Sequence, residues 1–208
     1  RRRHTRFRNV TGVQTCALPI FSGKKWLSRT AQGYIWVFRG TPLLVQLIII
    51  YTGLPQLGLV RFTVLESAIL GLALNEAAYL SEILRGGILS VAKGQTEAAR
   101  AIGLKPYQIF RLVVLPQALR VIIPPLGNSV NGLLKTTSIA SVISMEEILR
   151  RGQILMQEKF QVLEVFMVVA IIYLAMTTCW DLVQRRIEAY YGRAYGAVEN
   201  KQLARDDR

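Results

Sequence analysis

The sequence predicts an all-α, polytopic membrane protein with about four spanning helices and a short helix between the second and third of them. Apolar residues make up 51% of the 208-residue chain, and long stretches with few or no charges recur along it. One such stretch would also fit a buried core helix of a soluble protein. Four in series favour a chain that crosses a bilayer several times.

The four expected spans differ in how cleanly apolar they are. The first lies within 39–61, where no charge separates the flanking arginines over more than the roughly 20 residues that a hydrocarbon core requires. The second, 61–85, is interrupted by four polar residues, Glu66, Asn75, Glu76 and Glu82. The third, 109–134, contains two arginines and three prolines, Arg111, Arg120, Pro116, Pro124 and Pro125. These prolines either free backbone carbonyls toward a cavity or form a packing kink. The fourth expected span is 165–180.

The segment 97–103, with the sequence EAARAIG, predicts a short helix in the loop between the second and third spans. We expect the Thr96 hydroxyl to cap its start, and Glu97 to lie at the positive end of the helix dipole. Gly103 can take the left-handed conformation that ends a helix. A soluble helix would read the same over seven residues, but between membrane spans such a helix is suited to be held by a partner outside the membrane.

The formal charge of +13 is distributed unevenly. Basic residues precede the first span, occupy the loop around 97–103 and follow the last span, whereas the segment between the first two spans carries only Arg61. This positive-inside pattern places all three clusters in the cytoplasm, including a polar C-terminal tail, 191–208. The basic residues do not form a face that is interleaved with aromatic residues, so the sequence does not predict nucleic-acid binding.

Cysteine, histidine and nucleotide motifs exclude several other classes. Cys16 and Cys179 make no disulfide or metal framework, and a lone His4 supports neither a metal site nor a triad. The chain has no G-x-x-x-x-G-K-[ST] loop for nucleotide phosphates. Without a nucleophile–base pair or a metal cluster, the sequence does not predict an enzyme.

The N-terminus differs in character from the rest of the chain. Residues 10–20, VTGVQTCALPI, resemble a translated sequencing adapter, and the arginine-rich residues before them resemble out-of-frame read-through. A signal peptide also begins with basic residues, but the apolar stretch here is short and lacks a small-residue cleavage site. We therefore expect residues 1–20 to be non-native and residues 21–190 to form one membrane domain.

Seven short motifs occur in a fixed order along the chain. They are YIWVFRGTPLLVQ at 34–46, RGGI at 85–88, KGQ at 93–95, EAARAIG at 97–103, LPQALR at 115–120, PPLGN at 124–128 and SIASVI at 138–143. Together they resemble the polar amino-acid permease subunits of bacterial ABC importers, which have a type I, MetI-like transmembrane domain. The resemblance covers about residues 24–190. In the family's signature loop, Val113 replaces the usual isoleucine before Leu115 and Pro116.

Two features depart from the family pattern. Thr136 stands where the family often has an acidic residue, which would change the preferred substrate charge. The first of the family's five spans is expected to be missing, replaced by the adapter-like residues. A chain without that span would be an inactive fragment or a scaffold.

The resemblance implies a multi-pass permease of the bacterial inner (cytoplasmic) membrane, surrounded by lipid and paired with an identical or related permease. Its other partners would be cytoplasmic ABC ATPase subunits, which bind ATP and Mg²⁺, and a periplasmic or lipoprotein amino-acid-binding protein. This chain itself would bind no cofactor. Five loop residues would dock in a cleft of the ATPase and pass its closure to the spans as a rigid-body switch, namely Glu97, Ala98, Ala99, Arg100 and Gly103.

Polar residues inside spans usually face a cavity or a partner, and two groups are candidates for the substrate pathway. The first is Asn75, Glu76 and Tyr79, although residue 76 is turned about 100° from the face shared by 75 and 79. The second is Lys135, Thr137 and Ser138. The Lys135 ammonium would meet a substrate α-carboxylate, and the Glu76 carboxylate would meet an α-amino group or a cationic side chain.

Other interpretations stay open at this point. Lys135 would alternatively extend to the membrane interface, and Glu82 would only pair with Arg85. A secondary transporter or channel would use Glu76 and Lys135 as an ion relay, with 97–103 as an ordinary loop.

Overall fold

A computed structural model of the protein describes residues 25–206, and all the regular structure in this part of the chain is helical, which confirms the predicted fold class. The helices are α1 (Lys25–Gly40), α2 (Leu43–Ile48), η2 (Ile49–Gly53), α3 (Leu54–Gln56), α4 (Val64–Leu89), α5 (Lys93–Ala101), α6 (Pro106–Ile109), η3 (Phe110–Val114), α7 (Leu115–Thr136), η4 (Thr137–Ile143), α8 (Ile148–Lys159) and α9 (Val162–Asp206). The segment expected to be non-native, 1–20, lies outside the described residues.

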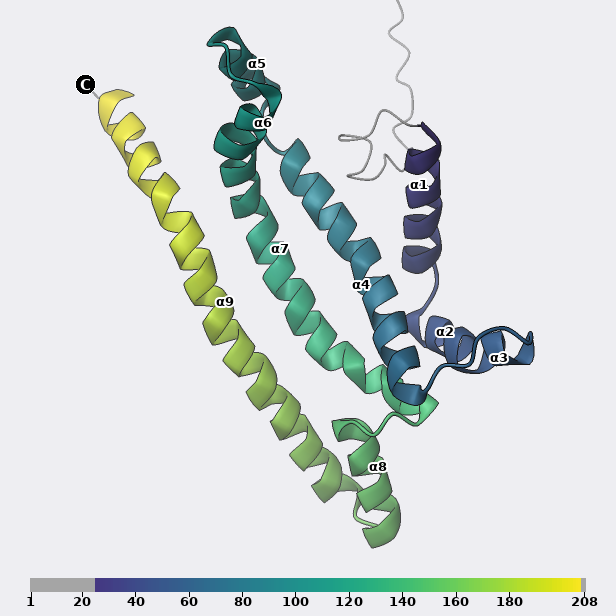
Figure 1. Cartoon of the computed structure of the whole chain (residues 1–208). Helices are drawn as coiled ribbons and strands as arrows, with labels where there is room; N and C mark the ends of the chain where they lie inside the picture. The colour runs from purple at the N-terminus through teal and green to yellow at the C-terminus, as the bar shows by residue number, and fades with distance from the viewer. Residues whose placement is uncertain (1–24, 207–208) are drawn as a thin grey trace, which may run out of the picture.

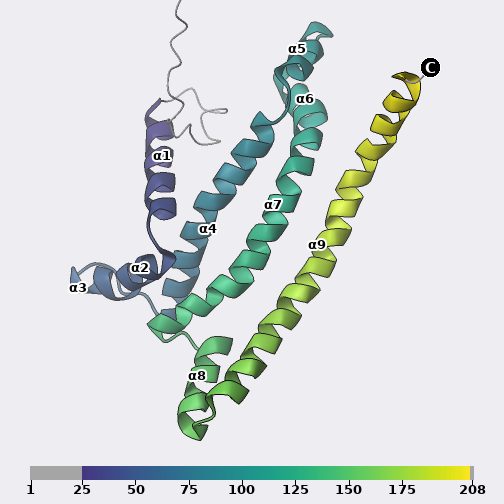
Figure 2. The same ribbon diagram turned by 180° about the vertical axis from the view of Figure 1, so that it is seen from behind.

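Three long helices, α4, α7 and α9, lie side by side in the order of the chain, and α1 packs on the free side of α4 (Figures 1 and 2). The start of α1, the short helix α5 and the end of α9 lie at one end of the molecule, the α5 end. Helices α2, α3 and α8 lie at the other, the α8 end. The segments that carry the three basic clusters therefore lie toward one end, apart from Arg39 in the last turn of α1. Which side of the membrane this end faces stays a prediction.

Within residues 25–206, two segments are long and apolar enough to span a membrane, Pro106–Ile143 and Val162–Tyr191. A third candidate is the pair Trp26–Gly40 and Leu43–Gln56, bent by 106°. Helix α4 has 26 residues and lies along α7, but it does not meet the same length and composition criteria because polar residues interrupt it.

The continuous first span expected over 39–61 is wrong. Helix α1 ends at Gly40 and the chain turns before Leu43. Pro42 explains the break, since proline has no N–H to donate and biases the residue before it away from helical geometry. The third expected span, 109–134, is longer in the structure and runs from Pro106 to Ile143.

Small residues let the long helices approach one another. A Cβ on Gly87 of α4 would overlap Ile122 of α7, and a Cβ on Gly127 of α7 would overlap Gln184 of α9. The Gln184 amide also donates to the Pro124 carbonyl at 3.4 Å. This contact joins α7 to α9 beside Pro124 and Pro125. Which of the two roles considered from the sequence these prolines serve stays a prediction.

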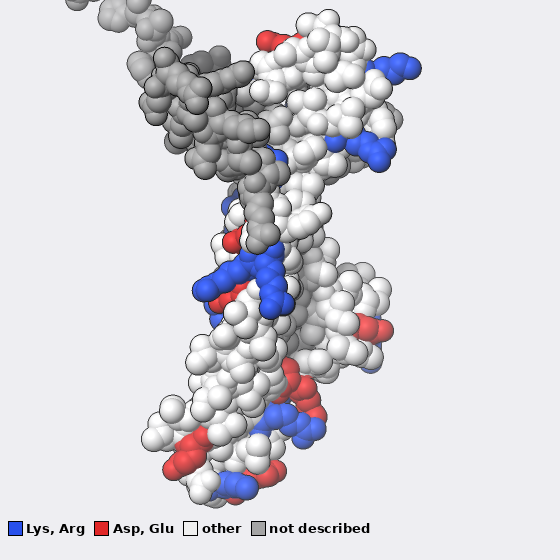
Figure 3. Space-filling model, turned by 90° about the vertical axis from the view of Figure 1, so that its left-hand side faces the viewer, with Lys and Arg blue, Asp and Glu red and all other residues white. Residues whose placement is uncertain are grey.

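The surface between the two ends is largely uncharged and apolar, as is typical of a surface that faces lipid. Figure 3 shows an uncharged stretch that separates the mixed acidic and basic side chains at the α8 end from a second, mostly basic group of side chains nearer the α5 end. On α9 many large apolar side chains are exposed, including Leu163, Ile171 and Leu174. Lipid tails would cover such a surface.

Candidate functional site

A polar cavity of about 580 Å³ opens where the chain bends between α1 and α2. The bend, the middle of α4 and the second half of α7 form its walls. The lining residues are Arg39, Gly40, Thr41, Pro42 and Leu43 from the bend, Leu72, Asn75, Glu76 and Tyr79 from α4, and Ser129, Gly132, Leu133 and Thr136 from α7. Of these, only Arg39 and Glu76 carry a formal charge at neutral pH.

The structure brings the first predicted group together. Asn75, Glu76 and Tyr79 all line the cavity. Residue 76 was expected to face away from 75 and 79, but α4 meets α1 on one side and α7 on the other. Side chains about 100° apart on the helix therefore reach the same space.

The second predicted group does not line this cavity. Lys135 is exposed, Thr137 Oγ1 donates to the Leu134 carbonyl at 2.8 Å, and Ser138 Oγ donates to the Lys135 carbonyl at 2.6 Å. From this segment it is Thr136 that contributes to the cavity wall. A role for Lys135, Thr137 and Ser138 in the pathway stays a prediction.

The Glu76 carboxylate lies between α4 and α7. The Ser129 hydroxyl donates a hydrogen bond to Glu76 Oε1. A carboxylate that lines a cavity and keeps acceptor capacity is suited to bind an ammonium group. Ser129 was not among the residues proposed from the sequence, because one sequence does not reveal which residues of α4 and α7 meet.

Asn75 holds the bend in place. Its amide donates to the Phe38 carbonyl and to Gln46 Oε1, both at 3.1 Å. The Gln46 amide in turn donates to the carbonyls of Phe38 at 2.9 Å and Thr41 at 3.1 Å. These bonds satisfy carbonyls left over where α1 ends, which a membrane environment requires. An isolated glutamine in the apolar run LLVQLIII was the available signal for Gln46.

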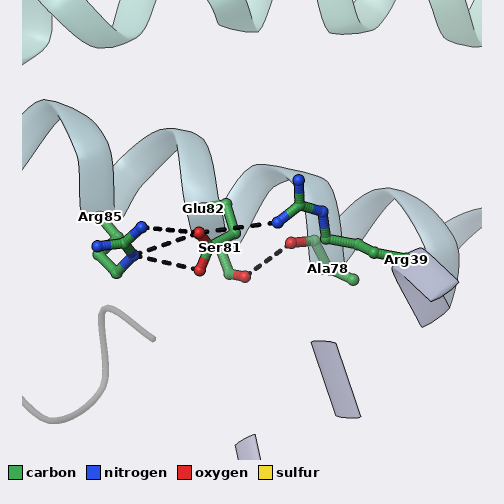
Figure 4. A network of polar contacts seen from close by, with 5 residues as sticks. All are labelled: Arg39, Ala78, Ser81, Glu82 and Arg85. Atoms are coloured by element: carbon green, nitrogen blue, oxygen red, sulfur yellow. Dashed lines mark hydrogen bonds and ion pairs between the residues drawn. The ribbon is translucent and has the colours of Figure 1, made fainter. Parts of the chain in front are cut away.

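Arg39 joins the cavity to a charge cluster on α4 (Figure 4). Its guanidinium carbon lies 5.3 Å from the centre of the Tyr79 ring, and its Nη1 lies 3.7 Å from Glu82 Oε2. Glu82 also pairs with Arg85, whose Nη2 is 2.9 Å from the same oxygen. The Glu82–Arg85 pairing was one of the alternatives left open by the sequence. The sequence alone gives no signal for a role of Arg39 in the cavity, because the residue lies at the edge of the predicted span 39–61.

The short helix between the spans begins earlier than expected. Helix α5 runs from Lys93 to Ala101, and Ala92 at its N-cap makes no side-chain hydrogen bond. The expected cap at Thr96 is wrong, because the Thr96 hydroxyl donates to the Lys93 carbonyl at 2.7 Å within the helix. Glu97 consequently lies beyond the first turn. The expected left-handed conformation of Gly103 is confirmed by its φ of 83°.

Within the predicted docking residues, one side chain points inward. Ala99 is 5% exposed and packs with Ile109 and Val114. Glu97, Ala98 and Arg100 are exposed. Of the two alanines expected to meet a partner, therefore, Ala98 is open and Ala99 fixes α5 against the start of the third span.

Comparison with known proteins adds independent findings. A family model described as "binding-protein-dependent transport system inner membrane component" matches residues 15–191. The octopine transport system permease protein OccM of Rhizobium meliloti is 45% identical over 168 residues, which cover 77% of this chain and 69% of OccM. The glutamine transport system permease protein GlnP of Escherichia coli K12 is 39% identical over 86% of this chain and 82% of GlnP.

A solved structure agrees in fold as well as in sequence. The crystal structure of an amino acid ABC transporter with histidines contains a chain that is 38% identical to this one. The two superpose with a TM-score of 0.76, over 81% of this chain and 78% of the solved chain.

Proposed function

Because the chain belongs to the family of inner membrane components of binding-protein-dependent transport systems, we propose that it is the permease subunit of an ATP-driven importer of amino acids. The observation that carries the proposal is the match to a chain of an amino acid ABC transporter at 38% identity and a TM-score of 0.76. The named substrates of its relatives, octopine and glutamine, point in the same direction. The chain is a multi-pass protein of the inner membrane.

The cavity at the bend is the proposed substrate pathway. Glu76 and Arg39 line it together with Asn75 and Tyr79, so it offers one anionic and one cationic group to a zwitterion. Glu76 accepts the α-amino group or a cationic side chain of the cargo.

The proposed contact with the ATPase is α5. Glu97, Ala98 and Arg100 are exposed on it, and Ala99 ties it to Ile109 and Val114 at the start of the third span. A pull on α5 therefore reaches that span directly. ATP and Mg²⁺ bind to the separate ATPase subunits, and this chain contributes no nucleotide site.

The proposed orientation follows from charge. The start of α1, the α5 region and the end of α9 share one end of the molecule (Figure 1), and their basic residues favour the cytoplasmic side. The C-terminus is then cytoplasmic. The α8 end faces the periplasmic or lipoprotein amino-acid-binding protein, and a second permease subunit, identical or related, completes the pathway.

Reconstitution tests this function. The chain is placed in proteoliposomes with its cognate ATPase and binding protein, and uptake of radiolabelled amino acids is followed with and without ATP. We expect uptake only when ATP is present on the side of the ATPase. Uptake that ignores ATP and follows an ion gradient would overturn the proposal in favour of a secondary transporter.

A further inference from the structure

We propose that Arg39 is the receptor in the cavity for the α-carboxylate of the substrate, and that Glu82 holds its guanidinium until a substrate carboxylate replaces it. The inference rests on the proposed function and deepens it, because it assigns the acidic end of the cargo to one residue. The sequence had suggested Lys135 for this role, but Lys135 is exposed and outside the cavity wall.

Arg39 lies between the cavity and the charge cluster. It comes from the last turn of α1, lines the cavity and reaches Glu82 on α4 (Figure 4). The Tyr79 ring, also in the cavity wall, lies 5.3 Å from its guanidinium carbon. An aromatic face supports a guanidinium without using its N–H donors. Those donors remain available to a planar carboxylate, which the guanidinium matches with two parallel hydrogen bonds.

The contact between Arg39 and Glu82 is the weaker of the two that Glu82 makes. It is a single approach of 3.7 Å, with the Arg39 side chain 42% exposed. Arg85 contacts Glu82 through two nitrogens, with Nε at 3.2 Å from Oε1 and Nη2 at 2.9 Å from Oε2. Long, exposed ion pairs contribute little stability. Arg39 is therefore the partner that detaches more readily.

Arg85 allows this exchange at low cost. A carboxylate left without a cation on a helix that lies among membrane spans would be strongly unfavourable. Glu82 keeps Arg85 when Arg39 turns away, so no such carboxylate results. The second arginine on Glu82 thus has a role in this exchange, because it keeps the carboxylate paired while Arg39 binds the substrate.

The charges around the cavity match a zwitterion. Arg39 and Arg85 share Glu82, which leaves one positive charge in excess on that side. Glu76 supplies one negative charge on the cavity wall, bound by the Ser129 hydroxyl. The four groups sum to zero but are separated in space. An amino acid would place its carboxylate at Arg39 and its ammonium at Glu76.

Direct binding to the permease–ATPase complex in lipid nanodiscs tests the assignment without the binding protein, which would select the cargo itself. L-Glutamine, L-histidine and L-arginine are titrated in turn by calorimetry, and each one that binds is compared with its α-carboxamide. The amide keeps the ammonium and loses the negative charge. We expect the wild-type complex to prefer the acid, and Arg39→Gln to lose that preference with about a ten- to hundredfold weaker affinity for the acid.

A matched control and a second variant complete the experiment. Arg29→Gln makes the same change at an exposed position on the same helix outside the cavity, and should discriminate as the wild type does. Glu82→Gln removes the competitor for Arg39, so it should bind the acid more tightly and the amide unchanged. This variant answers the question even where Arg39→Gln fails to assemble with the ATPase.

The outcomes separate the inference from the proposed function. Retained preference for the acid in Arg39→Gln, or unchanged binding of the acid in Glu82→Gln, overturns the role of Arg39 alone. A wild-type complex that binds none of the amino acids and shows no ATP-dependent uptake overturns the proposed function, and the role of Arg39 with it.

Discussion

Among the described residues that line the cavity, Glu76 is one of two charged residues and the only acidic one. Glu76→Gln keeps the shape of the side chain and an oxygen that accepts from Ser129, but removes the negative charge. We expect affinity for an amino acid to fall about tenfold or more, because a charge-assisted contact with the ammonium becomes a neutral one. Calorimetry on the nanodisc complex measures this. Glu158→Gln, at the end of α8, is the control and should bind normally.

Gly103 ends the α5 segment with a φ of 83°, and no atom beyond its chain neighbours lies within reach of an added Cβ. Its requirement is therefore conformational. Gly103→Val should cost about 1–2 kcal/mol at this turn and displace α5, so that uptake falls while the protein still inserts. Gly58→Val imposes the same strain at a φ of 71° near the α8 end. An equal fall in uptake in both variants would contradict a specific role for α5.

Glu97 is exposed on α5, where charge reversal affects a partner and leaves the interior of the protein unchanged. We expect Glu97→Lys to abolish ATP-dependent uptake and to reduce the amount of ATPase that co-purifies, with normal membrane insertion. Undiminished uptake would count against docking at this helix.

At the scale of helices, the bend between α1 and α2 depends on a pair of amides. Asn75→Leu removes the donors to Phe38 and to Gln46, whose side chain is 6% exposed. Leaving a buried amide oxygen without a donor costs about 1–3 kcal/mol. We expect a lower melting temperature in a fluorescence-based size-exclusion assay. A melting temperature equal to that of wild type would show that Asn75 does not hold the bend.

The contact between α7 and α9 is equally specific. A side chain at Gly127 would overlap Gln184, whereas Gly86 on α4 faces open space. Gly127→Leu should destabilise the protein by about 1–3 kcal/mol through overpacking, and Gly86→Leu should change it little. The two melting temperatures provide the comparison, and equal values would contradict the close packing of α7 on α9.

These elements show what one sequence can and cannot predict. Apolar stretches revealed the helical membrane class, and Gly103 revealed the end of α5. The predicted start of α5 is wrong because threonine is a common N-cap residue, whereas the helix already begins at Lys93 and Thr96 lies inside it. The bend at Pro42 is not predicted, because an interval without charges indicates an apolar segment but not whether its helix is straight or bent.

The cavity illustrates a second limit. Asn75, Glu76 and Tyr79 were identified as polar residues in an apolar setting, and they do line one cavity. Arg39 and Ser129 come from other helices, so their presence there depends on tertiary contacts that spacing along the chain does not encode. Helix geometry alone places Glu76 on a different face of α4 from Asn75 and Tyr79. Because α1 and α7 pack on both sides of α4, all three residues nevertheless line the same cavity.

At the scale of the whole molecule, the orientation is testable by labelling. In a background without Cys16 and Cys179, single cysteines replace Arg100 on α5 and Gln161 between α8 and α9. We expect a membrane-impermeant maleimide added outside intact spheroplasts to modify position 161 and not position 100. Modification of position 100 from outside would place α5 on the wrong side for any ATPase.

The unbroken length of α9 has a mechanical consequence. Its 45 residues contain no proline, and at 1.5 Å per residue they extend over roughly 67 Å. Neighbouring α7 carries two prolines at its middle and so is the more compliant of the two. A stiff helix beside a more compliant one would convert a small tilt at the α5 end into a larger sideways displacement at the α8 end, where α9 connects to α8.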